Sequence, residues 1–251
     1  MSLTGDIILL SSELAIKIYF RGQFFMKKNL TELVFIVDRS GSMGGLESDT
    51  IGGFNSTLKK QQELEGEAIV TTVLFDDKYE LLHDRIDIRA VSPLTEKDYF
   101  VRGSTALLDA LGRTIKKIKK AQKFTAEEYR AEKVMFVIIT DGYENASLEY
   151  NAERIKRRIE RQKDKYGWEF VFFGANMDAI MEAGKLGISA NMAHNYKADA
   201  EGLYFAWGTA GTAITDYRSN KPQPANNVRA DADKKGVLGC VKNFLFGIDN
   251  N

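Results

Sequence analysis

The stretch VFIVDRSGSMGG, residues 34–45, indicates both a fold and a site. Its first four residues are apolar and are β-branched or aromatic, which is typical of a strand buried on both faces. Three polar side chains, Asp38, Ser40 and Ser42, follow within five positions, and interspersed glycines allow the chain to bend tightly. The stretch therefore predicts a buried strand that ends in a polar loop.

Strand and helix patterns alternate along the rest of the chain. Further strands are predicted at residues 68–75, 134–139, 168–176 and 188–196, and residues 79–88 form a returning strand after a turn at 76–78. Helical spacing of apolar residues separates these strands, at residues 46–62, 107–118, 148–159, 177–187 and 203–217. This order predicts an α/β fold: a doubly wound, mostly parallel sheet with one antiparallel edge strand and helices on both faces.

Composition sets limits on function. The chain has 251 residues, of which 44% are hydrophobic and 28% are charged, an ordinary globular balance. Lys plus Arg equals Asp plus Glu at 35 each, so net charge gives no reason to expect a polyanion partner. The single cysteine, Cys240, cannot form an internal disulfide and fits a structural role, which favours a reducing compartment.

Residues 1–29 are expected to be an N-terminal extension. The apolar segment 6–25 is interrupted by four charged residues and lacks the features of a secretory signal, so it predicts neither a membrane span nor a leader. Residues 16–20 alternate weakly, as in an added strand. Because Met26 opens a segment typical of a natural start, we hypothesise that residues 1–25 arise from a misplaced start codon and are partly artefactual.

Residues 220–251 differ in kind from the preceding domain. Two prolines and many polar residues predict a linker, after which residues 237–246 are apolar. This apolar tail is consistent with packing on the domain, pairing with the N-terminal segment, or binding another chain.

Five oxygen-bearing side chains are expected to meet at one edge of the sheet. Asp38 and Asp141 each follow a predicted strand, and Thr105 lies in the loop before a predicted helix. Ligands of open α/β sheets bind beyond the carboxyl ends of the strands, where Ser40 and Ser42 also lie. Carboxylates and hydroxyls suit a hard cation such as Mg²⁺, and hydroxyl ligands leave its charge available to an outside carboxylate.

Three segments carry a resemblance to a known family: DRSGSM at 38–43, GST at 103–105 and TDG at 140–142. Together they resemble the von Willebrand factor type A (vWA) domain, a Rossmann-like fold, and its metal-ion-dependent adhesion site (MIDAS). The resemblance covers about residues 30–219, which we take as the domain. It implies Ser40, Ser42 and Thr105 as hydroxyl ligands, with Asp38 and Asp141 binding directly or through water.

The resemblance also implies a mode of action. A partner protein completes the metal shell with its own Glu or Asp, and no catalysis is implied. The cation is expected to be Mg²⁺, with Mn²⁺ and Ca²⁺ as alternatives. Family members range from extracellular adhesion proteins to cytoplasmic bacterial subunits, and the single cysteine favours the cytoplasmic bacterial type, often an adaptor. The partner is not indicated by the sequence, and no membrane association is expected.

Two other functions are weighed against this interpretation. Asp38 could be the nucleophile of a phosphoryl-transfer hydrolase, as in the haloacid dehalogenase-like fold, but that chemistry needs a carboxylic acid two positions later, where Ser40 stands. The basic runs 116–123 and 154–165 could bind RNA. Solvated helix faces are the favoured interpretation of both runs, so nucleic acid is not the expected partner.

The remaining polar and aromatic residues are interpreted as structural. Asp76 and Asp77 are expected to form the hairpin turn, and His83 and His194 to pack without ligand partners. The helical spacing of four aromatic residues predicts core positions rather than a stacking platform: Tyr204, Phe205, Trp207 and Tyr217.

Overall fold

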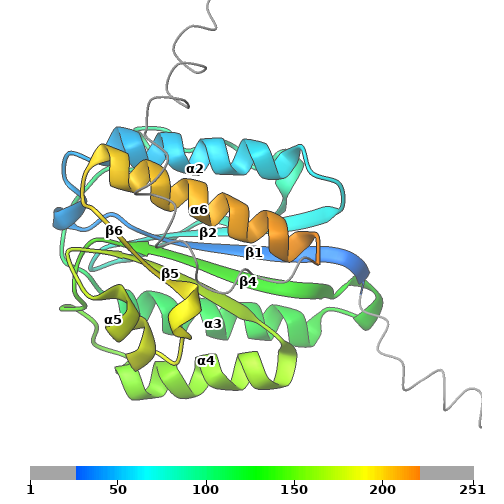
Figure 1. The fold of residues 1–251 in the computed structure, drawn as a ribbon. Coiled ribbons are helices and arrows are strands. Elements are labelled where there is room, and N and C mark those ends of the chain that lie inside the picture. The colour runs from blue at the N-terminus through cyan, green and yellow to red at the C-terminus, as the bar shows by residue number, and fades with distance from the viewer. Residues whose placement is uncertain (1–26, 221–251) are drawn as a thin grey trace, which may run out of the picture.

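The computed structural model describes residues 27–220, which form one six-stranded sheet between two layers of helices (Figure 1). The strands are β1 (Lys27–Asp38), β2 (Glu67–Phe75), β3 (Tyr79–Asp87), β4 (Ala131–Thr140), β5 (Glu169–Ala175) and β6 (Ala193–Tyr196). The helices are α2 (Glu47–Gln62), α3 (Leu107–Phe124), α4 (Ala152–Tyr166), α5 (Ala179–Lys185) and α6 (Ala200–Arg218). Short 3₁₀ turns occur at Gly41–Met43, Ile88–Ala90, Glu127–Tyr129 and Ala190–Met192.

The strand order is β3-β2-β1-β4-β5-β6, and only the β2–β3 pair is antiparallel. The predicted fold class, with its single antiparallel edge strand, is confirmed. The order reverses between β1 and β4, where the chain winds outward in both directions from the centre. In such sheets the crevice for ligands opens beyond the carboxyl ends of the strands at this reversal.

Alternate side chains of each central strand enter opposite layers, which explains the uninterrupted apolar runs. Phe35 and Val137 face α2 and α6, whereas Ile36 and Phe136 face α3, α4 and α5. Figure 1 shows α2 and α6 above the sheet, and α3, α4 and α5 below it. Trp207 of α6 is 2% exposed, and its indole packs against the backbone of α2, where glycine leaves room.

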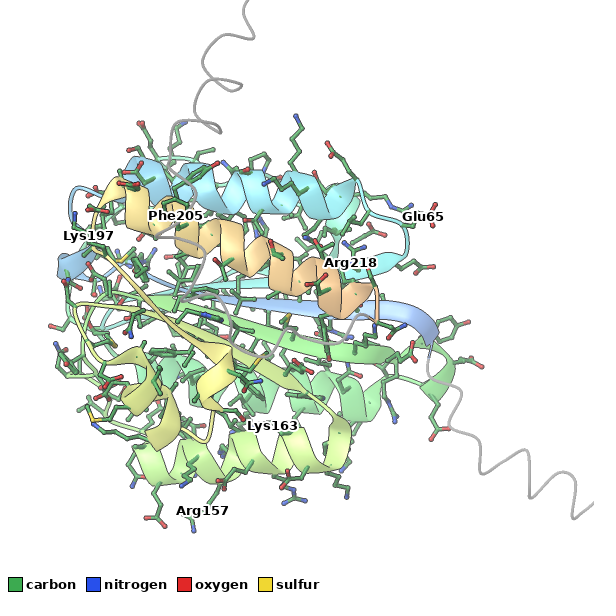
Figure 2. The ribbon with its side chains drawn as sticks, viewed as in Figure 1. Glu65, Arg157, Lys163, Lys197, Phe205 and Arg218 are labelled. Carbon is green, nitrogen blue, oxygen red and sulfur yellow. The ribbon has the colours of Figure 1, made fainter. Side chains whose placement is uncertain are left out.

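Thr105 lies in a loop, as predicted, and α3 begins at Leu107 because the preceding chain turns to contact the ends of β1 and β2. A predicted helix start and two predicted core positions are wrong. Leu148 is 95% exposed in a loop, since α4 begins only at Ala152 after the Asn151 cap. Tyr204 and Phe205 are 70% and 55% exposed and are not core residues (Figure 2).

Both histidines pack against aromatic rings, and Asp76 lies in the predicted turn. His83 is buried, shares a hydrogen bond with Thr72, and stacks on Phe54 at 6.4 Å between ring centroids. His194 stacks on Phe173 at 5.0 Å. Asp76 lies in the bend that joins β2 to β3, where its carboxylate accepts from the backbone N–H of Lys78 at 2.6 Å.

Some expectations concern residues outside the described range. The extension at 1–26, the linker and apolar tail at 221–251, and Cys240 are among them, so those expectations stay predictions. Among the helices between residues 27 and 220, none combines the length and the apolar character needed to cross a bilayer.

Candidate metal centre

Asp38 is the last residue of β1 and lies at the reversal of strand order. Its side chain is fully buried, and both carboxylate oxygens accept hydrogen bonds: Oδ1 from the backbone N–H of Ser40 at 2.7 Å and Oδ2 from the hydroxyl of Thr140 at 2.5 Å. Burial raises the pKa of Asp38 from 3.8 to about 6; these hydrogen bonds oppose the rise, and the nearby Asp141 adds to it. Asp38 is therefore held in position and is costly to ionise in the absence of a cation.

Three hydroxyls converge beside this carboxylate. The Oγ atoms of Ser40 and Ser42 lie 3.2 Å apart, and Thr105 donates to the Oγ of Ser40 at 2.9 Å. Ser40 and Thr105 are buried, whereas Ser42 is exposed. The hydroxyl cluster therefore opens to solvent on the Ser42 side.

Asp141 supplies the second carboxylate, directly after β4. It is 2% exposed, and neither of its oxygens has a hydrogen-bond partner in good geometry. Burial raises the pKa of Asp141, with a smaller opposing effect from the Ser42 hydroxyl nearby. An unpartnered buried carboxylate is unfavourable by itself, and a bound cation is the simplest compensation.

Gly142 leaves room for two of the hydroxyls. A Cβ atom there would lie 2.9 Å from the hydroxyl oxygens of both Ser42 and Thr105. Within residues 27–220 no cluster of three or more His, Cys, Asp or Glu residues could hold a metal. Two carboxylates and three hydroxyls thus make up the donor set, which suits a hard divalent cation. The structure brings all five predicted residues together, and their role as metal ligands stays a prediction.

A buried ion pair that the sequence analysis missed holds the Thr105 loop in place. Asp76 is fully buried and accepts from Arg39 at 2.8 Å and from Arg102 at 2.7 Å. The backbone N–H of Arg102 donates to the carbonyl of Arg39, and that of Ala106 donates to the carbonyl of Asp76. The signal was present in the sequence, because Arg39 stands inside the DRSGSM motif, but its partners are too far along the chain to infer.

Two further hydroxyl groups were also missed. Thr140 precedes Asp141 and holds Asp38, as described above. The hydroxyl of Tyr99 donates to the backbone carbonyl of Asp38 at 2.6 Å and is 1% exposed. Both hydroxyls donate to Asp38, and both residues are buried, so they position Asp38 and do not face solvent.

The loop after Asp141 is fixed to the beginning of α3. The Asn145 side chain accepts from the backbone N–H of Thr105 at 2.9 Å. Glu144 accepts from the N–H of Leu108 at 2.8 Å, and Asp109 accepts from three consecutive N–H groups of residues 148–150, each at 2.9 Å. This mutual capping satisfies backbone donors that would otherwise be unpaired. It therefore fixes Thr105 relative to Asp141.

Comparison with solved structures identifies the fold. No protein-family model and no curated protein matches the chain. The manganese-loaded TRAP protein of Plasmodium vivax superimposes with a TM-score of 0.55 at 19% identity, over 76% of this chain and 74% of that chain. This chain has the vWA fold.

Two further solved structures match with lower scores. Proximal thread matrix protein 1 of the mussel byssus, with a zinc-occupied MIDAS motif, gives a TM-score of 0.49 at 14% identity, over 76% of this chain and 47% of that chain. The von Willebrand factor type A protein of Catenulispora acidiphila gives 0.47 at 14% identity, over 72% and 42%. The chain spans less than half the length of these two proteins.

Proposed function

We propose that this vWA domain is a metal-dependent protein-interaction module. A divalent cation, Mg²⁺ in our proposal, would be held by Ser40, Ser42 and Thr105, with Asp38 and Asp141 contributing directly or through water. The cation would supply a positive charge that attracts a Glu or Asp side chain of a partner protein. The observation that supports this proposal most is the buried, unpartnered carboxylate of Asp141 beside the three hydroxyls.

The balance of charge at the site favours binding of an outside carboxylate. Only two of the five donors are anionic, so a divalent cation is neutralised but not overcompensated, and the hydroxyls add no charge. Ser42 is the exposed member, which places the opening where a partner side chain can approach. The manganese in the P. vivax neighbour is consistent with a cation in a vWA domain.

Catalysis by Asp38 is disfavoured by its surroundings. A nucleophilic carboxylate needs a free oxygen that faces the substrate. Both oxygens of Asp38 accept hydrogen bonds, and the side chain has no exposed surface. We therefore propose that the module acts by binding. The cytoplasmic bacterial setting and the adaptor role remain part of the same proposal.

Calorimetry tests the metal site directly. Mg²⁺, Mn²⁺ and Ca²⁺ are titrated into the wild type, into Thr105→Ala and into Ser56→Ala, a control that removes an exposed hydroxyl of α2 outside the site. We expect Thr105→Ala to weaken binding at least tenfold and Ser56→Ala to leave it unchanged. Equal affinity of all three proteins would contradict the assignment of the site.

A second experiment tests the interaction. Wild type and Thr105→Ala are each used to capture proteins from host lysate, with Mg²⁺ or with EDTA. We expect a protein retained only by the wild type with Mg²⁺, and loss of its retention when its acidic residue at the contact is changed to the amide. Equal retention under all four conditions would show that the metal does not govern recognition.

A further inference from the structure

A second feature is the groove between α3 and α4, in the helix layer that covers the face of the sheet away from α2 and α6. The groove has a volume of about 320 Å³, and five of its seven lining residues are cationic: Lys119, Arg154, Arg157, Arg158 and Arg161. No acidic side chain is among the residues that line it. Net charge is zero over the whole chain, so this groove is a local concentration of positive charge.

The positive charge continues along both helices. α3 contains six Lys or Arg residues against one acid, and α4 contains seven against three. On α4, Arg154, Arg158, Arg161 and Lys165 recur at helical spacing and so share one face. This basic stripe is longer than a single small anion, because a helix of 15 residues extends about 22 Å.

Most of the groove cations have no acidic partner within residues 27–220. Glu153 pairs with Arg157 at 3.9 Å, and Glu160 pairs with Lys156, also at 3.9 Å. Between residues 27 and 220, neither Arg154, Arg158 nor Arg161 makes an ion pair. Arg157 extends from the outer side of α4 into solvent (Figure 2).

Two of these arginines are held in position by an aromatic ring. The guanidinium carbons of Arg154 and Arg158 lie 4.9 Å and 5.1 Å from the centroid of the Tyr150 ring. Arg154 also donates to the backbone carbonyl of Glu149 at 3.3 Å. Stacking orders a guanidinium and leaves its remaining N–H groups free to donate, which lowers the entropy lost on binding a phosphate. The groove is therefore partly organised before a ligand arrives.

A buried amide lies beside these cations. Gln162 lines the groove, is 2% exposed, and its Oε1 has no hydrogen-bond partner among the described residues. A buried acceptor without a donor is unfavourable until a ligand supplies one. A nucleic-acid strand carries hydroxyl and amino donors beside its phosphates, and either kind can supply the missing hydrogen bond.

An exposed aromatic ring lies at the end of α4. Tyr166 is 47% exposed and stands one helical turn beyond Gln162, on the same side of the helix. Both α3 and α4 begin at the edge of the sheet where the parallel strands end, so their C-termini lie together at the opposite edge (Figure 1). Cationic side chains beside exposed aromatic rings are the combination that binds single-stranded nucleic acid without strong sequence preference.

We infer that the α3–α4 groove binds single-stranded nucleic acid, with phosphates on the arginines and a base stacked on Tyr166. The sequence alone favours solvated helix faces at these basic runs. The structure adds the convergence of the cations on one groove, the unpartnered amide and the aromatic end. This site lies on the other side of the sheet from α2 and α6 and does not use the metal.

Fluorescence anisotropy with a labelled 20-nucleotide single-stranded RNA of mixed sequence tests the inference on the full chain. The groove variant is Arg154→Gln/Arg158→Gln/Arg161→Gln. The matched control is Lys59→Gln/Arg89→Gln/Lys97→Gln, which removes the same charge from exposed positions outside the groove. Thermal unfolding of each protein confirms that it is folded.

We expect the wild type to bind in EDTA with an affinity that falls as salt rises. The groove variant should bind at least tenfold more weakly, with a log–log salt slope reduced by about 2, and the control should change less than twofold. Tyr166→Ala should weaken binding about tenfold without changing the salt slope. Thr105→Ala should bind RNA like the wild type, which separates this inference from the proposed metal function.

Three results would overturn the inference. Equal weakening in the groove and control variants would mean that net charge alone is sensed. A polyglutamate peptide or inorganic triphosphate that competes as well as unlabelled RNA would indicate a general anion site. No RNA binding by the wild type at 50 µM protein in 50 mM salt would exclude the site.

Discussion

Replacing Asp38 with asparagine should make the metal-free protein more stable at neutral pH. The folded protein raises the pKa of this carboxyl from 3.8 to about 6. Above pH 6 the group is ionised in both the folded and the unfolded chain, and the difference in pKa then destabilises the fold by about 3 kcal/mol. Asparagine removes that penalty. It has a single acceptor oxygen for the Ser40 N–H and the Thr140 hydroxyl, which costs about 1 kcal/mol.

The sign of the effect depends on pH. The folded chain holds its Asp38 proton more tightly than the unfolded chain, so this group contributes stability below pH 3.8 and loses that contribution as pH rises through about 6. We expect Asp38→Asn to be about 2 kcal/mol more stable than the wild type at pH 8. Near pH 4, where most of the penalty for ionising Asp38 is gone, we expect it to be less stable than the wild type by about 0.5 kcal/mol.

Urea unfolding in EDTA, followed by circular dichroism at pH 4, 6 and 8, measures both quantities. Mg²⁺ at about 100 times its dissociation constant should add about 2.7 kcal/mol to the wild type alone and reverse the order at pH 8. A stability difference that does not change with pH would refute this reasoning. Asp38 would then act as an ordinary hydrogen-bond acceptor, with no charge strain for a metal to relieve.

Three further changes test other parts of the structure. Burial raises the pKa of Asp76, but hydrogen bonds from Arg102, the Lys78 backbone and Arg39 outweigh burial, so the net pKa is lowered. Asp76→Asn should therefore destabilise the protein at pH 7 and lose that effect as pH falls toward 3. Urea unfolding at several pH values gives the comparison, and a gain in stability at pH 7 would contradict it. Gly142→Ala should weaken metal binding at least tenfold in calorimetry with little change in melting temperature, because the new Cβ displaces the Ser42 hydroxyl; unchanged affinity would mean that this hydroxyl is not a ligand. Phe136→Ala removes a fully buried ring stacked 4.7 Å from Phe170 and should cost about 3–5 kcal/mol while metal affinity of the folded protein is retained, as chemical unfolding and calorimetry would show.

The sequence predicts the central strands and the converging site residues well because both depend on local patterns. The run before Asp38 is apolar on both faces, so its strand and the polar loop beyond it follow from a few adjacent residues. The sequence predicts Thr105 in the loop before a helix because the apolar helical spacing begins only at Leu107, and the structure has it there. Backbone contacts with Arg39 and Asp76 hold this loop at the ends of β1 and β2.

Other features depend on contacts between distant residues and could not be inferred. The ion pair between Arg39 and Asp76 joins positions 37 residues apart. The exposure of Tyr204 and Phe205 follows from how α6 rotates against α2, with Trp207 as the buried anchor. The basic groove also depends on the packing of α3 against α4, since neither helix alone encloses a site.

Arg39 has a consequence for protein engineering. It occupies the variable position of the metal motif, yet its side chain is fully buried and contacts Asp76 at 2.8 Å and Glu80 at 2.8 Å. A six-residue motif transplanted from another vWA protein would bring its own residue to this position and leave Asp76 with Arg102 as its only remaining cationic partner. A successful graft between such proteins therefore has to exchange the Asp76 turn and the Arg102 loop together with the motif, as one unit.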